Sequence, residues 1–460
     1  MRNRLLSFML VAATVVPLGA ETLTLEQCRE LARQNNKELR IAGAEQQAAH
    51  WTRKSAFTNY LPKISVEGGY AFTSKPISLL NDEQKSTLTH IGDIAAGAAN
   101  QLPIPLGGLL QEPLNAVGQK VVDAFESDTR NSALIAATLT QPIYMGGKIR
   151  AYNKIAALAE EAAGHKLTLA EQDLLVEVDE TYWQIVSLES KRELAQAYLN
   201  VVSDLERNVQ AMIAEGVATK ADGLSVSVKV NQANVALIQA TNGVALLKML
   251  LCQICGLDEN TPIELVDEPM EEMTAIDGEV NRPELAAMEN LAAIGRQKIN
   301  LARAETLPNV ALMGGYTMVY PSLFNGFEKR FTGLWNVGVM VKIPLVTWGD
   351  RFYKVKAAKA QSFADQMKLE STREKINLQI SQSRQKVTEA EQSLAASKSA
   401  VEAADENLRF ATLGLKEGVI PVINVNEAQT AWLSARSQLI SSQIDLKLAQ
   451  LHLKKALGQL

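Results

Sequence analysis

The sequence is poor in aromatic residues and nearly balanced in charge. Aromatic side chains make up 5% of the 460 residues, which is lean for one large compact core and typical of long helices. The formal net charge is −5, from 46 basic and 51 acidic residues. This balance predicts neither a nucleic-acid footprint nor a polybasic membrane patch.

Cysteine and histidine are also scarce, which argues against a redox or metal centre. Cys252 and Cys255 form a C-x-x-C pair, but the pair comes late in a helical stretch, whereas redox pairs begin a helix beside a βαβ unit. A zinc site needs about four ligands at fixed spacing, and the four histidines are scattered. We therefore expect no cofactor, no metal and no catalysis. An enzyme that uses this cysteine pair is the alternative.

Only the N-terminus carries a sustained apolar run. A basic start, the run Leu5–Val16 and small residues up to Ala20 predict a secretory signal peptide over 1–20. This run is too short to span a bilayer as a helix. No later stretch reaches about 18 consecutive apolar residues, so the sequence predicts no transmembrane helix. An exported chain of this kind can enter a membrane only as a β-barrel.

The remaining chain contains an internal duplication. The segment Leu61–Tyr70 (LPKISVEGGY) recurs as Leu307–Tyr316 (LPNVALMGGY). Two further elements recur with a common shift. The segment Pro142–Gly147 returns as Pro344–Gly349, and the Glu-Gly-Val sequence at 215–217 returns at 417–419.

Four segments of about ten residues alternate apolar and polar side chains, near 64–73, 132–142, 310–320 and 333–344. Ten residues is about the length of a tilted transmembrane strand. Aromatic residues gather toward one end of the segments, as in an interfacial girdle: Tyr70, Phe72, Tyr316, Tyr320 and Trp335. The alternative is a soluble sheet with one wet face. Four strands cannot close a barrel, and lipid does not tolerate an open edge, so we expect three copies to share twelve strands.

A long helix follows each Pro…Gly segment. From Lys148 to Glu215, about 68 residues would extend roughly 100 Å. The positions of one mostly apolar stripe recur in alternating steps of four and three residues, as at Leu174, Val178, Thr181 and Ile185. The second repeat shows the same spacing from Ile376 onward. A mean spacing of about 3.5 predicts left-handed supercoiling, and a second apolar stripe predicts two lateral neighbours. A ring of helices fits this pattern, and an ordinary bundle or fibrous coiled coil is the alternative.

These patterns divide the mature chain into two repeats. The first covers 21–257, with an exterior loop at 74–131 and a helical hairpin at 148–257. The second covers 282–460, with a helical hairpin at 350–457. Between them, the acidic, proline-bearing segment 258–281 is expected to form a small equatorial excursion. The expected fold class is therefore long coiled-coil helices combined with transmembrane β-strands.

The order of these elements resembles the TolC-type outer membrane factor family. The resemblance covers nearly the whole mature chain. It rests on the repeated Leu-Pro…Gly-Gly-Tyr segments, the Pro…Gly turns and the two hairpin tips at 215–222 and 417–424. It implies a homotrimer in outer membrane lipid, in which a twelve-stranded β-barrel continues into a long periplasmic α-barrel.

The resemblance also implies the outer membrane channel of a tripartite efflux pump, which gives drugs, toxic compounds or metal ions a passive exit from the periplasm. The hairpin tips would contact a periplasmic adaptor (membrane fusion) protein, which links the channel to an inner membrane transporter. The tip residues are Gly216, Val217, Ala218, Thr219, Gly418, Val419, Ile420 and Pro421. Apart from any family, Gly216 and Gly418 suit a helix reversal because glycine tolerates positive φ.

The same resemblance places a periplasmic gate after the second tip. The family carries acidic residues six and nine positions after the tip glycine, and these positions are Asn424 and Glu427 here. The matching residue of the first tip is Asp222, which in the family helps to latch the closed state. A ring of three Glu427 carboxylates would favour cations and attract divalent ions. Ile420 replaces the basic latch residue of the family, which puts that latch in doubt here.

Two other functions stay open at this point. One is the exit duct of a type I protein secretion system, which the same family includes. The other is a trimeric coiled-coil surface or adhesion protein with a barrel anchor. An adhesin carries its barrel segment at one end of the chain, whereas here the predicted strands occur in both halves with helices between them.

Overall fold

The computed structural model describes residues 21–74, 77–78, 80–100, 107–127, 130–266, 280–322 and 329–460. The predicted signal peptide at 1–20 and much of the segment 258–281 lie outside these residues. The chain forms two compact units. One comprises the described residues within 1–51, 157–294 and 363–460, and the other those within 52–156 and 295–362. Each sequence repeat contributes to both units, because each repeat carries strands as well as helices.

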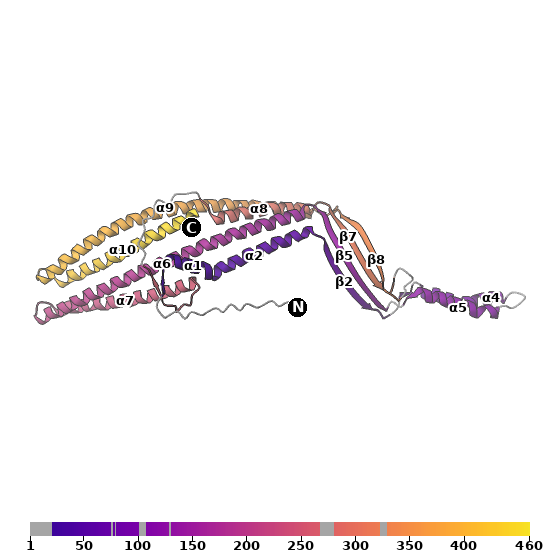
Figure 1. The fold of residues 1–460 in the computed structure, drawn as a ribbon, viewed down its shortest axis with the longest axis horizontal. Helices are drawn as coiled ribbons and strands as arrows, with labels where there is room; N and C mark the ends of the chain where they lie inside the picture. Colours follow the sequence, from indigo (N-terminus) through magenta and orange to yellow (C-terminus); the bar gives the residue numbers. More distant parts are fainter. Residues whose placement is uncertain are drawn as a thin grey trace, which may run out of the picture. The chain divides into compact units, whose positions relative to one another are not determined.

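Long helices dominate the first unit (Figure 1). The two longest, α6 (Lys148–Ala214) and α9 (Asp350–Lys416), have 67 residues each and contribute residues to both units. Each turns back into a return helix, α7 (Lys220–Ile254) or α10 (Val422–Leu457). The other helices are α1 (Leu25–Asn35), α2 (Lys37–Phe57) and α8 (Pro283–Ala304). A parallel pair joins β1 (Glu21–Leu23) to β6 (Ile263–Leu265).

The predicted heptad stripes of both long helices face inward. In α6, Leu174, Val178, Thr181 and Ile185 are all buried. The buried residues of α9 continue the same phase: Ile376, Ile380, Ala390, Val401, Ala404, Ala411 and Leu415. A spacing of about 3.5 residues keeps one stripe of each helix against its neighbours along its length. The heptad prediction is therefore confirmed for both helices.

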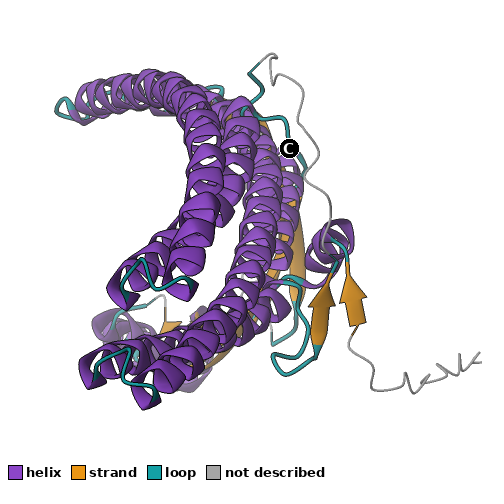
Figure 2. Cartoon of the chain, turned by 90° about the vertical axis from the view of Figure 1, so that its left-hand side faces the viewer, coloured by secondary structure: helices purple, strands orange, loops and turns teal. Residues whose placement is uncertain are grey.

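Four apolar clusters hold the described part of the first unit together, and two of them join the most elements. Near the hairpin turns, which are teal and face the viewer in Figure 2, all four hairpin helices contribute to one core. Its members are Leu205, Val209, Val226, Ala411, Leu415, Val422, Val425 and Ala428. A larger core joins α1, α6, α7, β1 and β6 around Cys28, Tyr182 and Leu251. Tyr182 also donates a hydrogen bond of 2.5 Å to the carbonyl oxygen of Val266, so this core satisfies its buried hydroxyl.

Helix α7 is long and apolar, although the sequence predicts no transmembrane helix. An 18-residue window of α7 reaches a mean hydropathy of 1.6, so by length and composition this helix could cross a membrane. The prediction of no such helix required an uninterrupted apolar run, and α7 interleaves its apolar residues with polar ones. Val226, Ala233 and Val244 of α7 are buried in the first unit, so we interpret α7 as a packing helix. Other large apolar side chains of α7 are exposed: Leu224, Val228, Val235, Ile238 and Leu246.

The second unit contains a four-stranded antiparallel sheet in the order β2, β5, β7, β8 (Figure 1). The strands are β2 (Lys63–Phe72), β5 (Asn131–Met145), β7 (Asn309–Tyr320) and β8 (Thr332–Lys342). The two repeats meet where β5 pairs with β7. Strands β2 and β8 form the edges, and each has one strand partner among the described residues.

The strand register places most of the large apolar residues of the four strands on one face. Val66 pairs with Ala137, Ala137 with Tyr316, and Tyr316 with Trp335. Residues directly opposite each other in antiparallel strands project from the same face of the sheet. The side chains of this face are largely exposed within one chain, as the exposed fractions of its edge residues show: Ile64 72%, Val66 69%, Trp335 74%, Val337 68% and Val339 62%.

The opposite face of the sheet is mostly polar or small, although it also carries Leu134, Val319 and Leu334. Ser65 pairs with Thr138, and their hydroxyls hydrogen-bond at 2.7 Å. Glu67 lies opposite Ala136 on this same face. The single sheet therefore has one apolar and one polar face, and neither is covered by a second layer of the described chain. A soluble sheet would bury its apolar face against such a layer.

Helices occupy much of the segment that we expected to be an exterior loop, 74–131. They are α3 (Asp82–Thr89), α4 (Ile91–Ala99) and α5 (Gly107–Phe125), with two short strands, β3 (Ile77–Ser78) and β4 (Glu126–Ser127). Glycines let these helices approach closely, since a Cβ atom on Gly92 would collide with the carbonyl oxygen of Gln111. The position of this segment between two predicted strands suggested an exterior loop, whereas glycines here serve helix packing.

Candidate functional site

Both hairpins of the first unit end in the same glycine turn. Gly216 has a φ of 74° and Gly418 a φ of 69°. The amide of Val217 donates to the carbonyl of Met212, and the amide of Val419 to that of Gly414, which is the pattern of a Schellman motif. A Cβ atom would meet nothing within 4 Å at either glycine. The tips are therefore open surfaces that place Val217 and Val419, 69% and 78% exposed, in solvent.

The return helices begin differently at the two tips. Thr219 caps α7, since its hydroxyl accepts from the amide of Asp222 at 3.2 Å. The Asp222 carboxylate in turn accepts from the Thr219 amide at 2.9 Å and from its hydroxyl at 2.7 Å. Pro421 begins α10 and makes no side-chain cap. In this structure Asp222 is therefore engaged as a capping residue of its own hairpin.

This cap gives a pH prediction. The hydrogen bonds that Asp222 accepts, first from the Thr219 hydroxyl and then from its amide, hold the pKa of Asp222 below its ordinary value of 3.8. A lowered pKa in the folded state means that the cap is fully formed above 3.8 and is lost as the pH falls through the lowered value. We expect carboxyl NMR titration to give Asp222 a midpoint below 3.8, and a higher midpoint in Thr219→Val, which loses the hydroxyl but keeps the amide donor. Identical midpoints in both proteins would contradict this assignment.

Glu427 lines a hollow between α7 and α10. The hollow has a volume of about 530 Å³ and is lined by Ser225, Lys229, Ile423, Asn426, Glu427, Thr430, Ala431 and Ser434. Glu427 is exposed and makes no ion pair with a described residue. Asn424 is also exposed, but neither Asn424 nor Asp222 lines this hollow. Within one chain, the structure does not bring the three predicted gate residues into one pocket.

Two residues of this hollow were not predicted from the sequence. Lys229 donates to the hydroxyl of Thr430 at 3.3 Å and places a cation in the same hollow as Glu427. Asn426 is 4% exposed, and its amide donates to the hydroxyl of Ser225 at 3.3 Å, while its Oδ1 has no partner. Asn426 follows Val422 and Val425 of the buried stripe. A polar residue within a core stripe was the signal that could have revealed it.

A second polar group joins the helices of the second hairpin. Trp432 of α10 donates from Nε1 to the Asp405 carboxylate of α9 at 2.7 Å, and Arg436 donates to the same carboxylate at 2.8 and 3.1 Å. Asp405 therefore holds two side chains of the return helix. A charge-assisted contact of this kind fixes the hairpin above its tip.

The C-x-x-C pair is part of a buried cysteine group rather than a reactive site. Cys28, Cys252 and Cys255 are all buried and unbridged. Cys255 donates to the carbonyl of Cys28 at 3.5 Å. Burial raises the pKa of Cys252, and contact with Cys28 together with burial raises that of Cys255. Raised pKa values keep both thiols protonated and weakly nucleophilic. No cluster of three metal-binding side chains occurs in the described ranges.

The strand-to-helix junctions of the second unit differ between the repeats. In the first, β5 continues through Pro142 to Met145, with a register shift between Pro142 and Tyr144 that accommodates a residue without an N–H. The turn of this repeat thus begins later than predicted, at Gly146 and Gly147, whose φ angles are 61° and 83°. In the second, β8 ends at Lys342, before Pro344.

The segments that join strands to helices are rich in basic residues. The four segments that join strands to helices are 52–63, 145–156, 295–308 and 342–362, all in the second unit. They carry two acidic residues, Glu305 and Asp350, and fourteen basic ones. The basic residues are Arg53, Lys54, Lys63, Lys148, Arg150, Lys154, Arg296, Lys298, Arg303, Lys342, Arg351, Lys354, Lys356 and Lys359. The sequence hid this excess because the segments are far apart in the chain.

The family described as outer membrane efflux protein matches residues 28–249 and 278–459, which is most of the chain. The chain belongs to this family. Among the curated relatives, Protein CyaE of Bordetella pertussis is 24% identical over 353 residues, which cover 73% of this chain and 72% of CyaE. The predicted resemblance to the TolC-type family is therefore confirmed.

Solved structures of outer membrane proteins share the fold. The outer membrane protein VceC of Vibrio cholerae has a TM-score of 0.75 and 17% identity, over 94% of this chain and 96% of VceC. CusC has a TM-score of 0.76 and 13% identity, over 94% of this chain and 91% of CusC. The chain thus has the fold of these proteins, and its family is that of outer membrane efflux proteins with a helical periplasmic part. Family and fold are those of channels rather than enzymes.

Proposed function

We propose that three copies of this chain form the outer membrane channel of a tripartite efflux pump, through which small molecules leave the periplasm. The observation that carries the proposal is the four-stranded sheet with two unpaired edges and one exposed apolar face. In lipid, every backbone N–H and C=O group of an edge strand needs a partner. Pairing β2 of one copy with β8 of the next satisfies both edges, and three copies give twelve strands.

The two faces of the sheet fit this arrangement. The face that contains Val66 and Trp335 would contact lipid, and the face that contains Ser65 and Thr138 would line the passage. In the helical part, the exposed apolar residues of α7, such as Val235 and Ile238, would pack against the neighbouring copy. We also propose that the segments 21–257 and 282–460 are two structural repeats, joined by an equatorial segment at 258–281.

The open tips are the proposed contacts of a periplasmic adaptor protein, which would connect the channel to an inner membrane transporter. Gly216 and Gly418 turn the chain without any packing above them, and Val217 and Val419 offer apolar side chains to a partner. A partner that covers both valines would remove apolar surface from water. The remaining tip residues, Ala218, Thr219, Ile420 and Pro421, belong to the same surface.

Glu427 is the proposed gate residue. Three exposed copies around one axis would form a carboxylate ring, with Asn424 one turn closer to the tip and Asp222 capping the neighbouring helix. Such a ring attracts cations, because Glu427 makes no ion pair with the described residues of its own chain and keeps its charge toward the passage. Lys229 in the same hollow would moderate the charge.

Conductance of the purified protein in a planar bilayer tests the channel and the gate together. We expect Glu427→Gln to weaken block by divalent cations by about tenfold, because the ring loses three charges. Glu417→Gln, which removes an equal charge from the exposed tip, should leave block unchanged. Equal block in both variants would refute the gate, and a wild-type protein that passes no current would refute the channel.

A further inference from the structure

We propose that a hollow at the strand-to-helix junction of the second repeat binds the phosphate headgroup of an anionic phospholipid. Arg351 and Arg303 would supply the charge, and Trp348 would lie at the boundary between headgroups and acyl chains. The proposal rests on the proposed function only in placing this junction at the periplasmic surface of the outer membrane. It names a lipid class and a site that the efflux function itself does not require.

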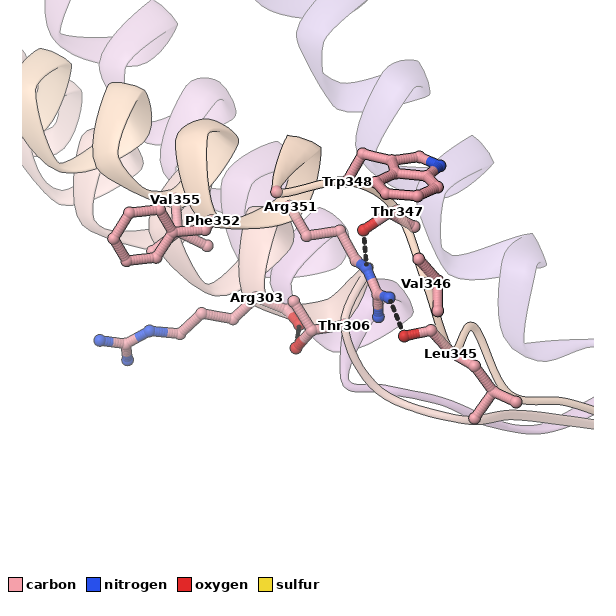
Figure 3. Close-up of a pocket in the computed structure, with 10 residues that line it drawn as sticks. Arg303, Thr306, Leu345, Val346, Thr347, Trp348, Arg351, Phe352 and Val355 are labelled. Atoms are coloured by element: carbon pink, nitrogen blue, oxygen red, sulfur yellow. Dashed lines mark hydrogen bonds between the residues drawn. The ribbon is translucent and has the colours of Figure 1, made fainter.

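The hollow lies within the second unit and has a volume of about 660 Å³ (Figure 3). Arg351 donates from Nε to the hydroxyl of Thr347 at 2.7 Å and from Nη2 to the carbonyl of Leu345 at 3.3 Å. These two bonds fix its guanidinium beside the linker, and its Nη1 has no partner among the described residues. A fixed guanidinium with a spare N–H group can donate a hydrogen bond to a phosphate oxygen.

Arg303 adds a second charge at the end of α8. It is exposed, and its guanidinium makes no hydrogen bond or ion pair with the described part of the chain. Figure 3 shows its side chain extending from the same hollow without meeting Arg351. The nearby Lys354 is already engaged, since it contacts Glu305 at 3.2 Å and Asp350 at 2.9 Å. Arg303 is thus a second lining cation, besides Arg351, that is available to an external anion.

Trp348 is held in a conformation that its own packing does not explain. It has a φ of 50°, which is unusual for a bulky residue, and it is 94% exposed. The corresponding residue of the first repeat is Gly146, where a Cβ atom would lie 2.6 Å from the carbonyl oxygen of Ala304. The first junction therefore requires glycine, whereas the second carries an indole in water. Tryptophan placed in this way is typical of a membrane interface.

The surroundings favour a lipid over a free anion. Leu345 and Val346, which line the hollow, are 85% and 72% exposed, and Phe352 is 59% exposed. These apolar side chains belong to one of the four segments that join strands to helices. Together, the four segments contain twelve more basic than acidic residues. A free phosphate ion gains nothing from exposed apolar side chains, whereas a phospholipid matches both the charge and the apolar surface.

Lipid binding to the purified protein tests the proposal. We would count phosphatidylglycerol molecules retained in native mass spectra, with phosphatidylcholine as the zwitterionic comparison. The wild type should retain phosphatidylglycerol in preference to phosphatidylcholine, and Arg303→Gln should lower that retention at least threefold. Lys398→Gln removes an exposed charge from α9 in the first unit and should leave retention unchanged.

Trp348→Gly supplies a second variant that cannot fail through strain, because glycine adopts a φ of 50° freely. It should match or exceed the wild type in thermal stability in detergent, yet lose phosphatidylglycerol retention. Inorganic phosphate at millimolar concentration should not displace the retained phosphatidylglycerol. If it displaces the lipid as effectively as added phosphatidylglycerol does, the hollow is a simple anion site and the proposal is overturned. Unchanged retention in both variants would also overturn it. Bilayer conductance of the same samples reports separately on the channel.

Discussion

Replacing Asp179 by alanine is expected to destabilise the helical unit by about 3 kcal/mol, because it removes the buried partner of Arg29 and leaves this guanidinium only the exposed Glu26 carboxylate. Arg29 of α1 donates to both carboxylate oxygens of Asp179 in α6, from Nε at 2.7 Å and from Nη2 at 2.6 Å. The Asp179 side chain is 4% exposed and that of Arg29 29%. Thermal or denaturant unfolding of the purified protein, followed by circular dichroism, measures the effect.

A second ion pair between the same two helices gives the control. Arg33 of α1 contacts Glu171 of α6 at 3.1 Å, with side chains 37% and 42% exposed. Water screens this pair, so Glu171→Ala should cost less than about 1 kcal/mol. If Asp179→Ala and Glu171→Ala lower the free energy of unfolding equally, burial of the Arg29–Asp179 pair does not contribute to stability.

Gly146→Ala is the second substitution with a large expected effect, about 3 kcal/mol. Part of this cost comes from placing an L side chain at a φ of 61°, and part from a new Cβ atom 2.6 Å from the Ala304 carbonyl oxygen and 2.9 Å from Leu307 Cβ. The clash involves backbone at the end of α8, which has little room to move. The junction between β5 and α6 should therefore loosen, and the unfolding midpoint should fall.

Gly147→Ala separates the two contributions. Gly147 has a φ of 83°, but a Cβ atom there would meet nothing within 4 Å. This substitution should lower the free energy of unfolding by about 1 kcal/mol, because it adds only the strain of an L residue at positive φ. If both alanine variants unfold at the same midpoint, the close approach of Ala304 to Gly146 is not what selects glycine there.

The arrangement of strands and helices followed from local pattern. The alternation around Val66 and Trp335 requires a strand, and the steps from Leu174 to Ile185 require a packed helix, because these periods are properties of the backbone itself. The same reasoning found the helix reversals, since Gly216 and Gly418 adopt the positive φ that a hairpin turn needs. What local pattern could not give was which strands pair. The β5–β7 contact joins residues of different repeats, and no local signal encodes it.

The site was less accessible to sequence reasoning than the fold. Glu427 and Asp222 were found through family positions, but their surroundings depend on packing between helices far apart in the chain. Lys229 and Asn426 belong to the Glu427 hollow only because α7 lies beside α10. Cys28 joins Cys252 and Cys255 for the same reason, since α1 packs on the end of α7. The exposed Trp348 carried a sequence signal, because tryptophan stands where the first repeat has Gly146.

The mass of the detergent-extracted particle tests the central claim most directly, that one chain supplies only a third of a closed sheet. Native mass spectrometry or light scattering should find three chains per particle and no stable single chain. A single chain that stays folded in water without detergent, with its four-stranded sheet intact, would contradict the account. In that case Ile64, Val66 and Trp335 would have to be covered by the chain itself, rather than by lipid.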